Sequence, residues 1–263
     1  ESQRAELTKA GWDSLDVGTE MVVNPNEWQT RGKKWQDVRT AINKAKRDGI
    51  TDVLTTFKEA PFSVQTQIRE ISAQWAGKKA LPEMGFTLGG VDELIDSRVR
   101  LLYAVDGNGK VLGVTSWLPT YRDGTIIGWT LDFMRHRTDS VNGIMEFLIA
   151  RMAERLRDEG NVEFMSLSAA PLAGMGSNES EHEESEVLRH ALQMVADIME
   201  PAYGFHSLFR FKLKFHPDEE KVYICYPDAA KLPQISLAVA QAYVPSLTPA
   251  EAMRFVRTIA PRD

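Results

Sequence analysis

The sequence contains little cysteine, no long apolar run and no excess of positive charge. Cys225 is the only cysteine among 263 residues, which excludes an internal disulfide and a cysteine-rich zinc site. No run of about 18 apolar residues is present, so the sequence predicts no membrane-spanning helix. The first residues show no signal-peptide pattern. The chain opens on Glu1 rather than on a methionine, and we therefore expect it to be part of a longer protein.

The composition is that of a globular chain. Hydrophobic residues make up 43% of the sequence and charged residues 26%. A chain of this length buries about three quarters of its unfolded surface, which allows a substantial core. The formal net charge is −6, and that figure taken alone argues against a nucleic-acid or anionic-membrane partner.

Strand-like and helix-like segments alternate along the chain, which predicts an α/β or α+β fold. The runs between residues 100 and 133 are separated by turn signals such as Asp106–Gly109, and we expect an antiparallel meander there. Capping by Asp139 or Ser140 and a stop at Gly160 predict one long helix. The expected strands are 15–23, 51–57, 100–105, 111–118, 125–133, 162–169 and 221–226; the expected helices are 35–49, 62–76, 141–158 and 186–199. This order is similar to that of the GNAT (Gcn5-related N-acetyltransferase) fold, a mixed central sheet with flanking helices.

A basic segment stands out between residues 31 and 47. Apolar residues recur at helical spacing from Trp35 to Ala45 and Gly49 follows, which predicts an amphipathic helix. Asp37 is its only acid, so the segment carries a net charge of +6. Cations on one helix face suit a phosphate backbone, and a solvated surface is the alternative. The basic residues are Arg31, Lys33, Lys34, Arg39, Lys44, Lys46 and Arg47.

Asp132 ends the third run of the meander, and Arg135 follows it. Simple alternation puts Ile127, Trp129, Leu131 and Phe133 on one face, and Gly128, Thr130, Asp132 and Met134 on the other. An aspartate at the end of an apolar strand has to be solvated, paired or functional. One interpretation is a structural pair between Asp132 and Arg135. The other is a carboxylate that binds a substrate ammonium or accepts a proton from an attacking hydroxyl.

The start of the long helix carries Asn142 and Gly143. In acetyl-coenzyme A-dependent GNAT enzymes this place holds a loop with two glycines whose amides bind pyrophosphate. Only one glycine is present between Arg135 and Gly143, and this counts against coenzyme A as the donor.

Basic and apolar residues alternate between Phe205 and Pro217. An extended conformation would put Arg210, Lys212 and Lys214 on one side as a cationic strip for phosphate. An ordinary amphipathic strand or turn is the alternative.

The remaining candidates carry less information. Glu83 lies in a loop rich in glycine and proline that could close over a pocket. Five glutamates between residues 179 and 186 indicate a solvated acidic loop, and the histidines show no metal-ligand spacing. Cys225 lies in an apolar strand and is interpreted as inert core.

Several segments together resemble the phosphatidylglycerol lysyltransferase family, also known as aminoacyl-phosphatidylglycerol synthases or multiple peptide resistance factors. The resemblance extends over about residues 15–227, and a joint match of five motifs is far more specific than any one of them. The motifs are Gly32–Gly49, Glu83–Gly89, Leu131–Arg135 with Asn142–Leu148, Phe164–Gly174 and Phe209–Pro217.

The resemblance implies two tandem GNAT-like folds, of which this chain would hold the second. Residues 1–23 would be the remnant of the preceding domain, and residues 24–263 the catalytic aminoacyltransferase domain. The family transfers an amino acid, lysine or another, from aminoacyl-tRNA to a lipid hydroxyl such as that of phosphatidylglycerol, which changes membrane charge. No metal and no cofactor are implied. The place of action would be the cytoplasmic face of the cell membrane.

The resemblance also suggests roles for single residues. Asp132 would hold the α-ammonium or act as base, Arg135 would orient Asp132 or an anionic oxygen, and Asn142 would position the substrate. Glu83 would line the amino-acid pocket. Phosphate would be held by Arg210, Lys212 and Lys214, and tRNA would be contacted by Arg39, Lys44 and Arg47.

Two alternatives stay open at the level of sequence. One keeps the tRNA donor and uses a peptide or cell-wall amine as acceptor, and the other is a non-catalytic module that binds tRNA or membrane. The net charge of −6 excludes neither, because only charges within a Debye length of about 8–10 Å act strongly on a ligand.

Overall fold

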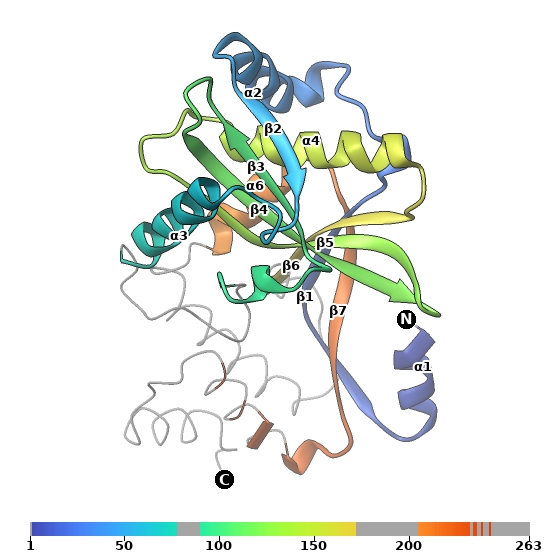
Figure 1. Cartoon of the computed structure of the whole chain (residues 1–263). Coiled ribbons are helices and arrows are strands. Elements are labelled where there is room, and N and C mark those ends of the chain that lie inside the picture. Colours follow the sequence, from blue (N-terminus) through green and yellow to red (C-terminus); the bar gives the residue numbers. More distant parts are fainter. Residues whose placement is uncertain are drawn as a thin grey trace. The chain divides into compact units, whose positions relative to one another are not determined.

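The structure is a computed structural model that describes residues 2–77, 90–171 and 205–231, together with residues 234, 235, 238 and 242 (Figure 1). The expectations for Glu83, the acidic loop and helix 186–199 lie outside these residues. Within them, no helix has the length and hydropathy to cross a membrane.

The elements follow the expected order closely. The helices are α1 (Ser2–Lys9), α2 (Gln36–Arg47), α3 (Phe62–Ala76), α4 (Ile144–Glu159) and α6 (Phe205–Leu213). The strands are β1 (Asp13–Val23), β2 (Thr51–Thr55), β3 (Arg100–Val105), β4 (Val111–Arg122), β5 (Thr125–His136), β6 (Phe164–Pro171) and β7 (Asp218–Tyr226). Short 3₁₀ turns cover Pro25–Glu27, Lys33–Trp35, Glu93–Ile95 and Ala229–Lys231.

The strands form a mixed sheet in the order β2-β3-β4-β5-β6-β1-β7. Strands β2 to β5 pair antiparallel in sequence, which confirms the predicted meander. Strand β6 returns through α4 and pairs parallel with β5. A mixed sheet with flanking helices is the fold class that the sequence predicts.

The chain divides into two compact units. The larger unit comprises Met21–Ser168 and Phe211–Asp218, and the smaller comprises Glu1–Glu20, Ala169–Arg210 and Glu219–Asp263. In the smaller unit, Lys221 pairs with Asp16 at 3.1 Å, and the Arg4 guanidinium lies 4.0 Å from the centre of the Tyr223 ring. The predicted domain boundary after residue 23 stays a prediction.

In the larger unit, helices cover both faces of the meander. Val114 of β4 belongs to a core that includes Ile68 and Ile71 of α3. Its neighbour Gly113 faces the other side, where a Cβ atom would lie 2.5 Å from Met145 of α4. Because neighbouring residues of a strand point to opposite faces, α3 and α4 sandwich the sheet.

Helix α4 also packs closely on α2. Gly143, just before α4, has a left-handed backbone with φ of +91°, and a Cβ there would meet the Ala41 Cβ at 2.9 Å. Glycine therefore satisfies both the turn and the contact. The predicted N-cap at Asp139 or Ser140 is wrong: Gly143 precedes the helix, the Ser140 hydroxyl lies 3.1 Å from Nδ1 of His136, and Asp139 pairs with Lys110. The predicted stop at Gly160 is confirmed. The hydrogen bond from Lys110 lowers the pKa of the Asp139 carboxyl.

The register between β4 and β5 shifts at two places, and the shift nearer the end of β5 is a one-residue bulge. Between the pairs Trp117↔Leu131 and Thr115↔Met134, β4 has only Ser116, whereas β5 has both Asp132 and Phe133. The Phe133 amide donates to the Ser116 hydroxyl at 3.1 Å. An extra residue reverses the alternation beyond it. The expected common face of Leu131 and Phe133 is therefore wrong.

The expected extended strip is wrong: Arg210 and Lys212 lie in helix α6, and Lys214 follows its last residue. Leu208, Phe211 and Phe215 recur at spacings of three and four, so the segment carries a helical stripe beside its period of two. Helix α6 ends at Leu213, before Pro217.

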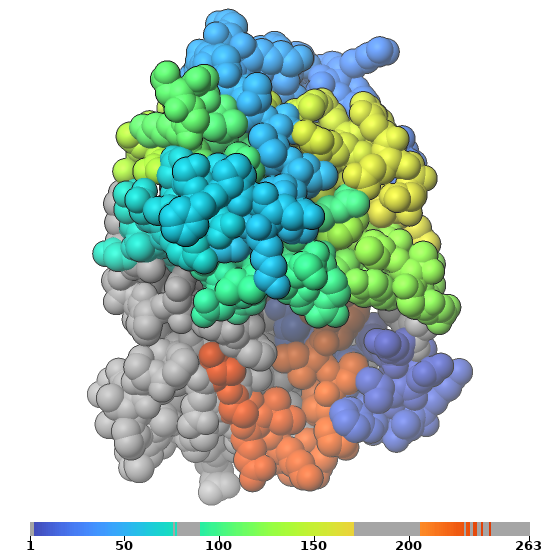
Figure 2. All heavy atoms as spheres, in the orientation of Figure 1, coloured from blue at the N-terminus to red at the C-terminus, as the bar shows by residue number. Residues whose placement is uncertain are grey.

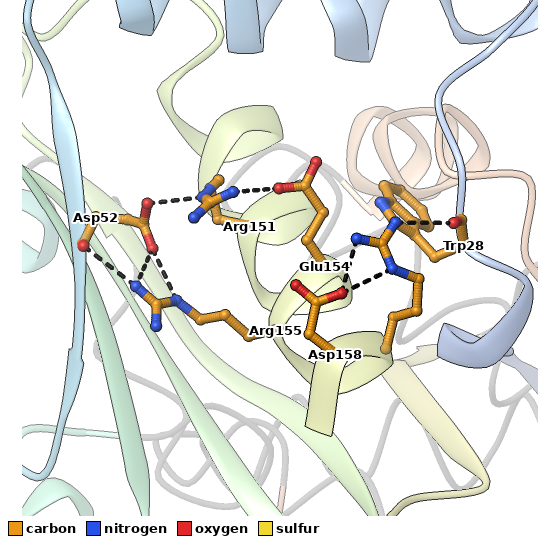
Figure 3. A network of polar contacts seen from close by, with 7 residues as sticks. Trp28, Asp52, Arg151, Glu154, Arg155 and Asp158 are labelled. Atoms are coloured by element: carbon orange, nitrogen blue, oxygen red, sulfur yellow. Dashed lines mark hydrogen bonds and ion pairs between the residues drawn. The ribbon is translucent and has the colours of Figure 1, made fainter. Parts of the chain in front are cut away.

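An ion-pair network ties α4 to β2 (Figure 3). The Asp52 carboxylate, 8% exposed, pairs with Arg151 at 2.7 Å and with Arg155 at 2.6 Å. On the same helix, Asp158 pairs with Arg157 but is 68% exposed.

We expect Asp52→Asn to lower the free energy of unfolding by about 1–3 kcal/mol, because two partly buried guanidinium groups lose their shared charged acceptor. Asp158→Asn is the matched control, with an expected change within about 0.5 kcal/mol. Urea denaturation of both variants measures the difference, and equal shifts would contradict the assignment of Asp52 as the main link.

Candidate functional site

A cavity of about 530 Å³ opens where β5 ends and α4 begins, within the larger unit. Its wall is formed by the end of β5, the loop to α4, the first turn of α4, Trp75 of α3 and Phe211 of α6. The described residues that line it are Trp75, Met134, Arg135, His136, Thr138, Ser140, Val141, Asn142, Gly143, Ile144, Met145, Glu146 and Phe211. Two predicted site residues, Arg135 and Asn142, therefore share one cavity.

Arg135 is buried, with 3% of its surface exposed. Its guanidinium carbon lies 4.3 Å from the centre of the Trp75 ring and 4.4 Å from that of Phe133. One terminal nitrogen donates to the hydroxyl and the carbonyl of Ser72. The bulge in β5 is what turns this side chain toward α3. The aromatic stack and Ser72 hold a fixed positive charge at the cavity wall.

Glu146 places a carboxylate in the same cavity. It lies in the first turn of α4, where the helix dipole favours negative charge. Its Oε1 accepts from the Lys214 ammonium at 2.8 Å, and the side chains of Glu146 and Lys214 are 15% and 37% exposed. Lys214, predicted to hold phosphate, is thus joined to the cavity through an acid.

The strands β5 and β6 part close to Asp132. They pair from Gly128 to Thr130, and beyond this the Ser168 hydroxyl donates to the Leu131 carbonyl. Ser168 itself has a φ of +67°. The buried Lys212 ammonium donates to the Ser168 carbonyl at 3.2 Å. Lys212 therefore lies at the parting of the strands.

Asp132 occupies the bulge next to Leu131, and it is half-buried and has an interaction partner. At this point β5 has left its pairing with β6 but still pairs with β4. Its predicted role stays a prediction.

The basic segment forms α2 and the loop before it, and Figure 2 shows α2 on the molecular surface. Arg39 donates to the carbonyls of Thr30 and Gly32 at 2.8 and 2.9 Å. These hydrogen bonds hold the loop before α2 in place. Arg47 is exposed and Lys44 is half-buried. Both remain candidates for a phosphate contact.

Aromatic rings connect this loop to the residues after α6. Trp28 lies 4.9 Å from Trp35 and 6.4 Å from Phe215, measured between ring centres. His216 lies 4.8 Å from Trp35 and bonds the Lys34 carbonyl at 3.0 Å. The basic loop is therefore packed against the chain that carries Lys212 and Lys214.

The structure brings together part of the predicted set. Arg135 and Asn142 line the cavity and Lys214 reaches it through Glu146, whereas Arg210 belongs to the smaller unit and Glu83 is outside the described residues. Among the residues that the structure describes, no cluster of His, Cys, Asp or Glu could hold a metal ion.

Sequence reasoning missed the residues Ser72, Trp75, Glu146 and Ser168. The signal for Glu146 was its place three residues after Gly143, in the first turn of a helix at a predicted site. For Ser72 and Trp75, no local signal exists, because their contact with Arg135 joins residues about 60 apart.

A family model described as phosphatidylglycerol lysyltransferase, C-terminal, matches residues 1–226. The chain belongs to this family. The resemblance read from the motifs is thereby confirmed.

Sequence relatives agree with this membership. An uncharacterised protein of Corynebacterium glutamicum is 41% identical over 239 residues, which cover 91% of this chain and 30% of that protein. Phosphatidylglycerol lysyltransferase of Bacillus subtilis is 29% identical over 222 residues, which cover 82% of this chain and 24% of that protein. The chain thus spans less than a third of the length of these relatives.

The fold is also found in L-PGS from Bacillus licheniformis, with a TM-score of 0.73 and 23% identity. That match covers 92% of this chain and 70% of the other. At this identity the likeness concerns the fold alone.

We expect Arg135 and Trp75 to be energetically coupled. In a double-mutant cycle with Arg135→Met and Trp75→Leu, the coupling free energy should be about 1–2 kcal/mol, because a desolvated guanidinium rests on the indole face. Urea unfolding of the wild type, both single variants and the double variant gives this value. Additivity within about 0.3 kcal/mol would show that the stack contributes nothing.

Proposed function

We propose that this chain is the aminoacyl-transfer domain of an enzyme that moves an amino acid from tRNA to a lipid hydroxyl such as that of phosphatidylglycerol. The observation that carries the proposal is the cavity lined by Arg135, Asn142 and Glu146 next to the exposed basic helix α2, in a member of the lysyltransferase family. The cytoplasmic face of the membrane is the proposed place of action, because charged tRNA and the lipid headgroup meet there.

The reaction is an ester exchange. The lipid hydroxyl oxygen attacks the carbonyl carbon that joins the amino acid to the tRNA 3′ end, its proton passes to a base, and the tRNA hydroxyl leaves with a proton. No atom is oxidised or reduced. Because the ester is already activated, positioning and charge stabilisation suffice for catalysis.

We propose a separate role for each of these residues. Asp132 accepts the hydroxyl proton or binds the α-ammonium, Arg135 balances the oxyanion and Asn142 positions the substrate. The rigid stack around Arg135 supports this, since a donor that is already fixed stabilises developing charge without reorganisation. Arg39, Lys44 and Arg47 contact tRNA, and the exposed Arg210 binds phosphate.

Asp132→Asn should reduce amino-acid transfer to lipid by about 10²- to 10⁴-fold, the usual contribution of a general base. The full-length protein with membranes and a panel of labelled aminoacyl-tRNAs supplies the assay, and lipid extraction with mass spectrometry identifies the product. Asp123→Asn in the β4–β5 turn is the control, because its φ of +49° is one that asparagine adopts readily.

Each outcome separates the alternatives. A water-soluble product would favour a peptide amine as acceptor. Absence of turnover with every charged tRNA, together with retained tRNA binding, would favour a binding module and refute the transferase.

Lys44→Gln combined with Arg47→Gln should weaken tRNA binding and make it less sensitive to salt. Each lost phosphate contact lowers the slope of log K against log salt by about 0.7–0.9, so the double variant should lose about 1–2 units. Filter binding over a salt series measures the slope. The exposed pair Lys58→Gln and Arg98→Gln removes the same charge elsewhere, and an equal loss there would refute a specific contact of α2.

A further inference from the structure

One titratable side chain of the cavity wall is available to a ligand. His136 ends β5, is exposed and lines the cavity. The two charged residues of the described wall have partners within the chain, since Glu146 accepts from the Lys214 ammonium and Arg135 is held between aromatic rings. Asp132 is not among the described lining residues. His136 is therefore the described group of this wall that can exchange a proton with a ligand.

Hydrogen bonds determine which nitrogen of His136 can act. Nδ1 lies 2.7 Å from the Arg137 carbonyl oxygen and 3.1 Å from the Ser140 hydroxyl. A carbonyl oxygen only accepts, so Nδ1 carries a proton and donates it to this bond. In the neutral imidazole the lone pair then lies on Nε2. Among the residues that the structure describes, Nε2 has no hydrogen-bond partner.

The carbonyl that holds the ring belongs to a residue that is itself held. The Arg137 amide donates to the Leu112 carbonyl at 3.0 Å. Its guanidinium donates to the Val111 carbonyl at 2.7 Å and to the Gln67 side-chain oxygen at 3.1 Å. These contacts join the end of β5 to β4 and α3. The imidazole is therefore oriented by a third group, as in histidines that transfer protons.

The bulge in β5 places this imidazole on the side of the sheet that α4 covers. His136 pairs with Gly113, and a Cβ added to Gly113 would lie 2.5 Å from Met145 of α4. Directly paired residues of neighbouring strands share a face, so His136 projects toward α4. The register shift that turns Arg135 toward α3 thus also brings His136 to the cavity.

We propose that His136 is a catalytic residue of the transfer, whose Nε2 accepts the proton of the attacking hydroxyl and returns it to the departing tRNA oxygen. One C–O bond forms and another breaks at the same carbonyl carbon, so a single imidazole reaches both oxygens. The proton taken up during attack is given back during departure, and the enzyme ends unchanged. Histidine suits both steps because imidazole gains and loses a proton near neutral pH. The inference rests on the proposed function and leaves Asp132 to bind the α-ammonium.

His136→Asn tests the role with little disturbance of the loop. The asparagine amide can still donate to the Arg137 carbonyl in place of Nδ1, but nothing replaces Nε2. We expect transfer to lipid by the full-length protein to fall about 10²-fold or more, the usual contribution of acid–base catalysis, with tRNA binding unchanged. His206→Asn is the matched control and should keep the wild-type rate, because this exposed histidine is not a described lining residue.

Imidazole in solution separates a chemical role from a structural one. His136→Ala leaves room for a free imidazole, which should raise the transfer rate of this variant about 10-fold or more and should not raise that of the wild type or of Asp132→Asn. Thermal unfolding confirms that each variant is folded. Transfer by His136→Asn within about threefold of the wild type would overturn the inference, and so would a His136→Ala variant whose rate imidazole does not raise.

The wild-type protein keeps this inference separate from the proposed function. Absence of transfer by the wild type from any charged tRNA to lipid overturns the proposed function. If the wild type transfers and His136→Asn is equally active, the role of His136 alone is overturned.

Discussion

The extra residue in β5 is the constraint on which the site depends. A strand presents alternate residues to alternate faces, so one insertion exchanges the faces of everything beyond it. Here the insertion falls at Asp132 and Phe133 opposite Ser116, and it turns Arg135 toward Ser72 and Trp75 of α3. It also lies next to Leu131, where Ser168 bonds β5 just beyond its pairing with β6. One register shift thus brings a buried cation to the cavity wall and puts a carboxylate beside the strand parting.

The sequence was sufficient to predict the elements in which apolar residues recur at a single spacing. Helices α2 and α3 and the meander follow from apolar spacing and from turn residues, and the structure confirms them within a few residues. The segment from Phe205 to Pro217 shows where this reasoning fails, because it carries periods of two and of nearly four at once. The bulge was equally hidden, since an inserted residue leaves a strand apolar and changes only its register with the neighbouring strand.

The sequence also could not show which cationic side chains are available to a ligand. Composition gives −6 and the segment 31–47 gives +6, yet neither number says which cations are available to a ligand. Arg39 orders its own loop and Lys214 pairs with Glu146, so both predicted phosphate ligands have internal partners. Pairings of this kind join residues far apart in sequence, and only the packed fold reveals them.

Arg135 and Glu146 line the same cavity and are held independently of each other. Arg135 of β5 rests on the rings of Trp75 and Phe133, whereas Glu146 of α4 pairs with Lys214. Their partners are different residues, so the aromatic stack that fixes Arg135 does not depend on the ion pair of Glu146. The cavity wall therefore has two charged groups whose positions are set by separate contacts.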